Sequence, residues 1–198
     1  MSARNWLVPT SLFLVYCTAV PRRGELAVPD VRQSTDYTCG ASALQAVLAY
    51  YGIGVREDHL SSEMAATPRD GVPPEAIVRA ARAHGLTADM RENMTVDDLG
   101  AALLERRPVI VELQAWADPP RTDWDNDWDD GHYAVVIAIE GDQLIFEDPS
   151  VLGSRSVLPR YEFEKRWHDS DSGRRHIRTG IVFGGKAPVL PQARVHME

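Results

Sequence analysis

The chain has 198 residues, of which 44% are hydrophobic and 25% are charged. These fractions exclude a disordered or fibrous protein, and the length fits one domain of ordinary size. Aspartate and glutamate number 29 against 21 lysines and arginines, which gives a formal net charge of −8. Because a negatively charged surface repels phosphate, we expect no nucleic acid among the partners.

Cysteine and histidine usage gives no indication of a metal or cofactor site. The chain has two cysteines, Cys17 and Cys39, which are too few for a disulfide scaffold and whose spacing matches no zinc motif. The histidines are scattered and lack the spacing of metal ligands. We therefore expect neither a metal ion nor a cofactor, and each cysteine is considered by itself.

The N-terminus carries an apolar stretch, Trp6–Val20, that is interrupted by Pro9. Fifteen residues fall short of the about 20 that cross a bilayer, so no stable membrane span is expected. Small residues around Cys17 resemble a signal cleavage site, which leaves export as the alternative to a cytoplasmic protein with an N-terminal extension. We expect residues 1–25 to be this extension or signal segment, residues 26–185 to form the domain, and the proline-containing residues 186–198 to be a loose tail.

The first half of the chain is predicted to be mainly helical. A short extended strand is predicted over Leu26–Val31. After it, apolar residues at spacings of three and four predict a helix capped by Thr38 and ended by Gly52. Further helices are expected over 57–66, from Pro74 to Gly85, and after Thr95, which lies three residues before Asp98 in the spacing of a capping box.

The second half changes to runs of β-branched and aromatic residues. Strands are predicted over 109–113, 132–139 and 143–147, and the last two are joined as a hairpin by a turn at Gly141. A helix led by Pro159 and a final strand over 177–183 complete the order. Helices first and neighbouring strands later favour an α+β fold in which a helical N-terminal half packs on an antiparallel sheet.

Cys39 lies at the start of the helix that is predicted most clearly. Free backbone N–H groups and the helix dipole stabilise a thiolate there, which suits a nucleophile. The alternative is a small buried side chain in the first turn, which is the commoner role of a lone cysteine.

His132 begins the first strand of the predicted hairpin, and Asp148 directly follows the second. Counted outward from Gly141, His132 is nine residues away and Asp148 seven, so the two are expected to be near neighbours. A carboxylate beside an imidazole orients the ring and favours its protonated form, which in turn favours the thiolate of a facing cysteine. Gln33, six residues before Cys39, is close enough to help stabilise an oxyanion.

Three stretches resemble a known family: the segment from Val31 to Gly52 around Gln33 and Cys39, the run Gly131-His132-Tyr133-Ala134-Val135-Val136-Ile137, and Phe146-Glu147-Asp148-Pro149-Ser150. They are similar to the papain-like cysteine peptidases that process bacteriocins at double-glycine leaders. The resemblance implies a papain-like fold with Cys39 as nucleophile, His132 as general base and acid, Asp148 as the orienting residue and Gln33 as oxyanion donor. Many members are domains of peptide-exporting ABC transporters. This chain has no P-loop and no membrane span, so it resembles stand-alone members.

The segment Asp118–Asp130 holds six aspartates and two tryptophans and ends just before His132. Its alternating aspartates do not complete a calcium loop, because the glycine comes one place late. A solvated acidic loop is one interpretation. The other is a substrate-binding rim in which Asp127, Trp124 and Trp128 favour a basic peptide.

The sequence therefore predicts a cysteine peptidase that hydrolyses peptide bonds through a thioester on Cys39. Two alternatives remain. The same thioester could pass its acyl group to an amine, as in an acyl or aminoacyl transferase, or the domain could bind peptides without catalysis. Retention of all four site residues disfavours the last alternative.

Overall fold

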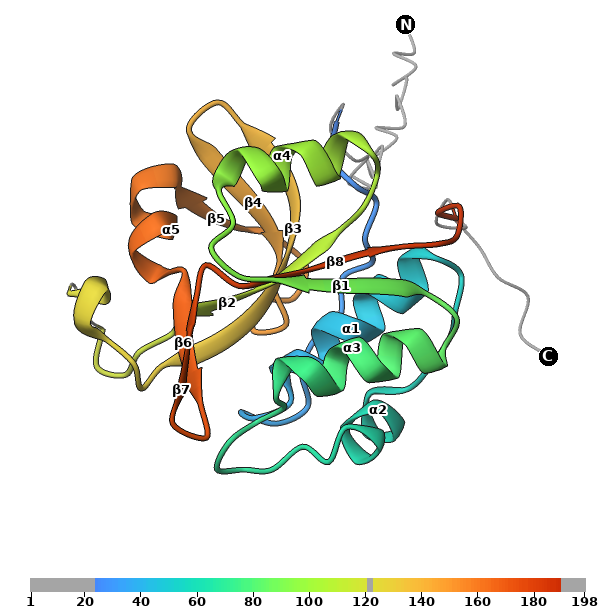
Figure 1. Cartoon of the computed structure of the whole chain (residues 1–198), viewed down its shortest axis with the longest axis horizontal. Coiled ribbons are helices and arrows are strands. Elements are labelled where there is room, and N and C mark those ends of the chain that lie inside the picture. The colour runs from blue at the N-terminus through green and yellow to red at the C-terminus, as the bar shows by residue number, and fades with distance from the viewer. Residues whose placement is uncertain (1–23, 121–122, 190–198) are drawn as a thin grey trace, which may run out of the picture.

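The computed structural model describes residues 24–120 and 123–189, in which a six-stranded sheet separates two groups of helices (Figure 1). The helices are α1 (Cys39–Tyr50), α2 (Glu57–Glu63), α3 (Pro74–Ala83), α4 (Val96–Leu104), the 3-10 turn η1 (Trp124–Asn126) and α5 (Arg160–Arg166). The strands are β1 (Thr87–Arg91), β2 (Val109–Gln114), β3 (Gly131–Glu140), β4 (Gln143–Glu147), β5 (Ser156–Pro159), β6 (His168–Asp171), β7 (Arg174–Ile177) and β8 (Gly180–Gly184).

The main sheet is antiparallel throughout, with the strand order β1-β8-β2-β3-β4-β5. Strands β6 and β7 pair only with each other and form a hairpin beside the sheet. The predicted α+β class with an antiparallel sheet is confirmed. The predicted hairpin with its turn at Gly141 is the β3–β4 pair, in which Glu140 faces Gln143.

Both faces of the sheet are covered, and this explains why β2 and β3 are apolar along most of their length. Successive residues of β3 point to opposite faces: Val135 packs in the cluster with α1 and α3, and Val136 packs in the cluster with α4 and α5. Figure 1 shows α1 and α3 on one side of the strands and α4 on the other. The helical half is thus not a single layer, since α4 covers the face opposite α1.

Helix α1 packs closely against the start of β3. A Cβ on Gly40 would lie 3.1 Å from the ring of Tyr133, tighter than most real contacts, so glycine favours this close approach. The predicted cap at Thr38 is only partly right. Thr38 occupies the N-cap position, but its hydroxyl bonds to Thr35 and not to the helix. At the other end Gly52, with φ +75°, follows the helix as predicted.

Helix α4 begins with the predicted capping box. The hydroxyl of Thr95 accepts a hydrogen bond from the backbone N–H of Asp98 (3.2 Å), and the Asp98 carboxylate accepts one from the backbone N–H of Thr95 (2.8 Å). Two backbone donors that the helix leaves free are thereby satisfied.

Several predicted elements need correction. The segment Leu26–Val31 forms no strand in the structure, although the backbone N–H of Leu26 donates to Ile137. Helix α2 ends at Glu63, three residues before the predicted end, and the predicted final strand is divided between β7 and β8 by Arg178, whose φ is +48°. The sequence did not indicate the short strands β1, β5, β6 and β7.

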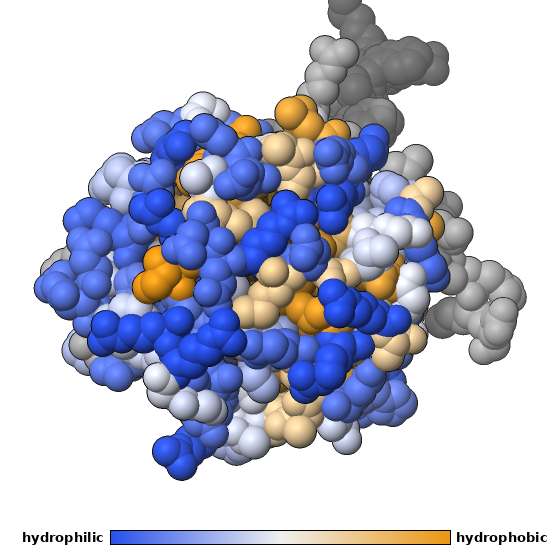
Figure 2. Space-filling model, in the orientation of Figure 1, coloured by the Kyte–Doolittle hydropathy of each residue, from blue (hydrophilic) through white to orange (hydrophobic). Residues whose placement is uncertain are grey.

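The face in Figure 2 is mostly hydrophilic, with small separated hydrophobic areas, in keeping with the acidic composition. Among the described residues, no helix is both long enough and apolar enough to cross a membrane. The predicted signal stretch, Trp6–Val20, and Cys17 lie outside the described residues, as does most of the predicted tail. The described end of that tail contacts the domain, because the backbone N–H of Val189 donates to the carbonyl of Tyr50.

Candidate active site

Cys39 is the first residue of α1, and its side chain is 8% exposed. It is a free cysteine, and the neighbouring His132 side chain lowers the pKa of its thiol. The backbone N–H groups of Tyr133 and Gly40 also bond to its sulfur. The sulfur therefore faces an imidazole and two backbone donors at the N-terminus of a helix, an environment that stabilises a thiolate.

His132 is the second residue of β3, and Asp148 directly follows β4. The His132 Nε2 and the Asp148 Oδ1 are 2.8 Å apart, and both side chains are buried. Val135 pairs with Glu147 in the ladder, and a bulge between Val136 and Ala138 shifts the register nearer the turn. The structure thus brings together the two residues that the hairpin spacing predicted to be neighbours.

The Asp148 carboxylate accepts four hydrogen bonds. Its Oδ1 also accepts from the backbone N–H of Ser150 (2.9 Å), and its Oδ2 accepts from the hydroxyl of Ser156 (2.8 Å) and the indole Nε1 of Trp116 (3.2 Å). All available lone pairs of a carboxylate are thereby engaged, which fixes the side chain in one orientation.

These contacts shift the titration of all three groups. Burial raises the pKa of the Cys39 thiol, but the hydrogen bond and charge of His132 outweigh burial, so the pKa lies below its ordinary value. Burial lowers the pKa of His132, but hydrogen bonds to Asp148 and Cys39 raise it to about 10. For Asp148, burial is outweighed by the bond from His132, and its pKa is lowered. The arrangement favours a thiolate beside an imidazolium.

Gln33 lies between the loop that precedes Cys39 and the segment that follows Asp148. Its side-chain Nε2 donates to the carbonyl of Thr35 (2.8 Å), and its Oε1 accepts from the hydroxyl of Ser150 (3.3 Å). Its backbone N–H donates to the carbonyl of Pro149 (3.0 Å). One amide hydrogen is thus used by Thr35, and the second is the one that could serve an oxyanion.

The three residues predicted to contact substrate lie in different surroundings. Trp124 is buried beneath the guanidinium of Arg166, 3.6 Å from its ring centre. Trp128 is half-buried, and its ring lies tilted against that of His168 with ring centres 4.4 Å apart. Asp127 is buried, and its Oδ1 accepts from the backbone N–H of Asp129.

Two cavities flank the candidate site. One, of about 470 Å³, is lined mainly by apolar side chains and by His132, Asp148, Trp116 and Trp124. The other, of about 330 Å³, is lined by Cys39, Trp128 and mainly polar residues. Trp124 thus lines the cavity that includes His132, and Trp128 lines the cavity that includes Cys39.

Sequence reasoning missed Trp116, which is 57% exposed and adopts a φ of +61°. This φ is rare for a large side chain and is typical of functional sites. It places the indole on Asp148, 32 residues along the chain. Only the order of the strands brings these residues together, so local sequence gave no indication of it.

No group of three or more His, Cys, Asp or Glu side chains within residues 24–120 and 123–189 is arranged to hold a metal ion. A nucleophile, a base and an orienting carboxylate can instead perform covalent acyl chemistry with protein groups alone.

Comparison with known proteins finds two curated relatives. The Pediocin PA-1 transport/processing ATP-binding protein PedD of Pediococcus acidilactici is 31% identical over 136 residues, which are 68% of this chain and 17% of PedD. An uncharacterized protein of Methanothermobacter marburgensis is 29% identical over 121 residues, which cover 61% of this chain and 71% of that protein.

Solved structures show the same fold. A C39-like peptidase from Bacillus anthracis matches 80% of this chain and 96% of its own, with a TM-score of 0.62 and 18% identity. The peptidase domain of Streptococcus ComA, a bifunctional ABC transporter, matches 79% and 97%, with a TM-score of 0.58 and 23% identity. A double glycine motif protease solved with its leader peptide matches 84% and 97%, with a TM-score of 0.57 and 23% identity. The predicted papain-like peptidase fold is confirmed. A family model described as the Peptidase_C39 like family matches residues 25–173, about three quarters of the sequence, and the chain belongs to that family.

Proposed function

We propose that the protein is a cysteine peptidase that hydrolyses peptide bonds through a thioester on Cys39. The observation that carries this proposal is the position of His132 between Cys39, whose pKa it lowers, and Asp148, which is bonded to its Nε2 at 2.8 Å. Family and fold support a peptidase of the cysteine type, and the proposal assigns its chemistry to these three side chains.

The Cys39 thiolate attacks the carbonyl carbon of the scissile peptide bond. The His132 Nε2 is bonded to Asp148, so its Nδ1 is the nitrogen that faces the reaction. The imidazolium passes its proton to the amine nitrogen as the C–N bond breaks, which leaves a thioester and a neutral imidazole. That imidazole then removes a proton from water as the water attacks the thioester, and the acid product and the thiolate–imidazolium pair result.

The oxyanion formed in each step needs donors. The backbone N–H of Cys39 lies in the first turn of α1, where N–H groups have no intrahelical partner. We assign the second donor to the remaining amide hydrogen of Gln33. Its side chain is held by Thr35, in the loop that precedes α1, and by Ser150.

The proposed substrate is a peptide or protein segment in extended form. A related protease has been solved with its leader peptide, and in this chain Trp124 and Trp128 line the cavities on either side of the site. Trp124, Trp128 and Asp127 are the proposed substrate-contacting residues, and a basic peptide is the proposed substrate class. The proposed compartment is the cytoplasm, and export is the alternative.

The test uses a library of internally quenched peptides, including double-glycine sequences, with purified protein and a Cys39→Ala variant. Cleavage by the wild type and none by the variant is expected. Equal cleavage by both proteins would overturn the mechanism. Added amines distinguish the transferase alternative: products that become amides in place of acids would show that the thioester is passed to an amine.

A further inference from the structure

The polar cavity at Cys39 has an unusual concentration of negative charge. Six of its lining residues are acidic, and Arg69 is its one cationic lining residue. Arg69 is exposed and lies 3.6 Å from Asp70. We call this cavity the acidic pocket; its carboxylates are those of Asp36, Asp70, Glu112, Asp129, Asp169 and Asp171.

Glu112, at the floor of this pocket, is the observation that points to a ligand. Its side chain lies on β2 directly opposite Tyr133, and the residue is 2% exposed. Its Oε1 is 2.9 Å from the Tyr133 hydroxyl, whereas its Oε2 is fully buried and has no hydrogen-bond partner among the described residues. The Nδ1 of the His176 ring lies 3.8 Å from this Oε2, beyond hydrogen-bond distance. A buried carboxylate oxygen without a donor is costly to the fold.

The hydrogen atoms around Tyr133 indicate how Glu112 is held without a cation. The Tyr133 hydroxyl lies 2.9 Å from both the carbonyl of Val72 and the Glu112 Oε1, yet it has a single hydrogen to donate. Both bonds form together when Tyr133 donates to Val72 and a protonated Glu112 donates to Tyr133. In agreement, burial raises the pKa of Glu112 to about 8.

Asp169 is a second, half-buried acid of the pocket. Its carboxylate lies over Gly131, where a Cβ would approach it to 2.5 Å, so glycine before His132 makes room for this acid. Burial raises its pKa to about 6. Two neighbouring acids with raised pKa values are the pattern expected of a site that a cation completes.

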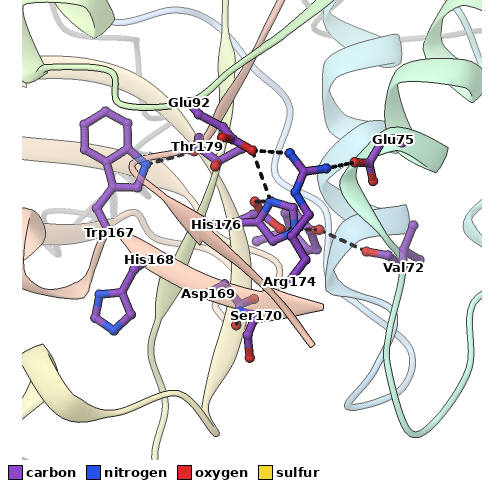
Figure 3. Close-up of polar contacts among 12 residues, drawn as sticks. Val72, Glu75, Glu92, Trp167, His168, Asp169, Ser170, Arg174, His176 and Thr179 are labelled. Atoms are coloured by element: carbon purple, nitrogen blue, oxygen red, sulfur yellow. Dashed lines mark hydrogen bonds and ion pairs between the residues drawn. The ribbon is translucent and has the colours of Figure 1, made fainter. Parts of the chain in front are cut away.

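The wall that carries Asp169 is held firmly in place. Asp169 belongs to the β6–β7 hairpin, and Arg174 on the second strand pairs with both Glu75 of α3 and Glu92 after β1 (Figure 3). Arg175 lies over the ring of Trp128, 4.4 Å from its centre. Arg174 and Arg175 of the hairpin are thus directed to Glu75, Glu92 and the Trp128 ring rather than to Glu112 or Asp169.

We propose that the acidic pocket is a specificity subsite that takes the ammonium or guanidinium group of a substrate residue next to the scissile bond, with Glu112 and Asp169 as its charged contacts. This inference rests on the proposed peptidase function and deepens it. It moves the main recognition of positive charge from the acidic loop at Asp118–Asp130 to the pocket that opens at Cys39.

The pocket also gives the selectivity a pH dependence. The groups that face Glu112 are Tyr133 of β3, His176 of β7, Asp169 and Asp171 of β6, and Glu75 of α3. Asp169 and Glu112 ionise as the pH rises through about 6 and about 8. The preference for a cationic substrate is therefore expected to increase between pH 5.5 and 8.5, with release of a proton when the cation binds.

The test compares matched quenched peptides that carry lysine or its neutral analogue norleucine at each position around the cleaved bond. For the wild type we expect the ratio of kcat/KM, lysine over norleucine, to reach on the order of tenfold at one position and to rise with pH. In Glu112→Gln the ratio should fall severalfold and lose the part of its rise near pH 8, while the rise through about pH 6 that Asp169 causes should remain. Asp142→Asn, which removes an exposed acid at the β3–β4 turn, is the matched control and should keep the wild-type ratio.

The outcomes separate this inference from the proposed function. A wild-type ratio near one at every position, with cleavage that depends on Cys39, would overturn the subsite and leave the peptidase standing. Loss of all Cys39-dependent cleavage would instead contradict the function. If Glu112→Gln does not fold, Asp169→Asn gives the same measurement, and an unchanged ratio in that variant would overturn the assignment.

Discussion

His132 and Asp148 are joined through Nε2 and Oδ1 at 2.8 Å, and this one contact sets the orientation of the reactive pair. Because Nε2 is committed to the carboxylate, Nδ1 is left for Cys39. Because the carboxylate accepts three further hydrogen bonds, it cannot rotate to release the ring without breaking several of them at once.

Replacement of Asp148 by asparagine is expected to lower kcat by about 10²- to 10⁴-fold without abolishing cleavage, because the nucleophile stays in place while the charge that supports the imidazolium is lost. The measurement is kcat and KM on the best cleaved peptide, with Asp142→Asn as the control for loss of one negative charge. A wild-type rate in Asp148→Asn would show that this carboxylate does not orient the base.

The reactivity of Cys39 is expected to titrate below the pKa of a free thiol, about 8.5. The physical cause is the hydrogen bond and charge of His132, which outweigh burial. The rate of alkylation by iodoacetamide, measured against pH in a Cys17→Ser background, reports this pKa directly.

In the same background His132→Ala should raise the pKa of Cys39 to or above the free-thiol value, because burial then acts with less opposition. If both proteins titrate alike, the thiol and the imidazole are not coupled, and a non-catalytic binding domain becomes the better interpretation.

The sequence was sufficient for the parts of the fold and site that depend on local spacing. The capping box at Thr95, the helix ended by Gly52 and the hairpin around Gly141 each follow from residues a few positions apart. The contact between His132 and Asp148 could be predicted in the same way, because the turn of a hairpin sets which residues of its two strands lie side by side.

Contacts set by strand order could not be predicted in this way. Glu112 contacts Tyr133 because β2 pairs with β3. Trp116, which follows β2, contacts Asp148 because β4 is the next strand after β3 in the sheet. Two of the missed strands are short and polar: β6 reads His-Asp-Ser-Asp and β7 Arg-Arg-His-Ile, and neither has the apolar alternation on which strand prediction depends.

Trp116 is expected to act as a positioning residue for Asp148. Trp116→Phe removes the indole N–H that donates to the Asp148 Oδ2 but keeps a ring at the cavity wall. We expect kcat to fall by about tenfold with a smaller change in KM, since a hydrogen bond to a charged group contributes about 1.5–3 kcal/mol. Trp116→Ala should lower kcat as well and also raise KM, because it removes the apolar wall.

The split between kcat and KM, measured on one peptide for both variants, distinguishes positioning from a purely structural role. Equal kcat in wild type, Trp116→Phe and Trp116→Ala would show that the indole contributes nothing to the carboxylate's orientation.

The buried side chain of Glu147 is expected to make the stability of the fold decrease as the pH rises. Its side chain is fully buried beside Asp148; Oε1 accepts from the backbone N–H of Val31 (3.1 Å), whereas Oε2 has no hydrogen-bond partner among the described residues. Burial raises its pKa to about 8. Between the unfolded value of about 4.3 and this folded value, the native state binds the proton more tightly. The contribution of Glu147 to stability is therefore lost as the pH rises through that window.

Glu147→Gln keeps the shape and the acceptor for Val31 but cannot ionise. We expect the Tm of Glu147→Gln, relative to that of the parent protein with Glu147, to rise by several degrees as the pH increases from 5.5 to 8.5. The reason for this size is that 1 kcal/mol corresponds to about 2–4 °C for a domain of this size. Thermal unfolding is measured in a Cys39→Ala background, which removes the titration of the thiol from the comparison. Glu105→Gln, an exposed acid after α4, is the control and should show no such trend.

The contradicting result would be a Tm difference between Glu147→Gln and its parent that stays constant with pH. It would mean that Glu147 is already ionised in the folded protein. Arg155, the basic group whose charge lowers the pKa of Glu147, would then be sufficient to stabilise the carboxylate.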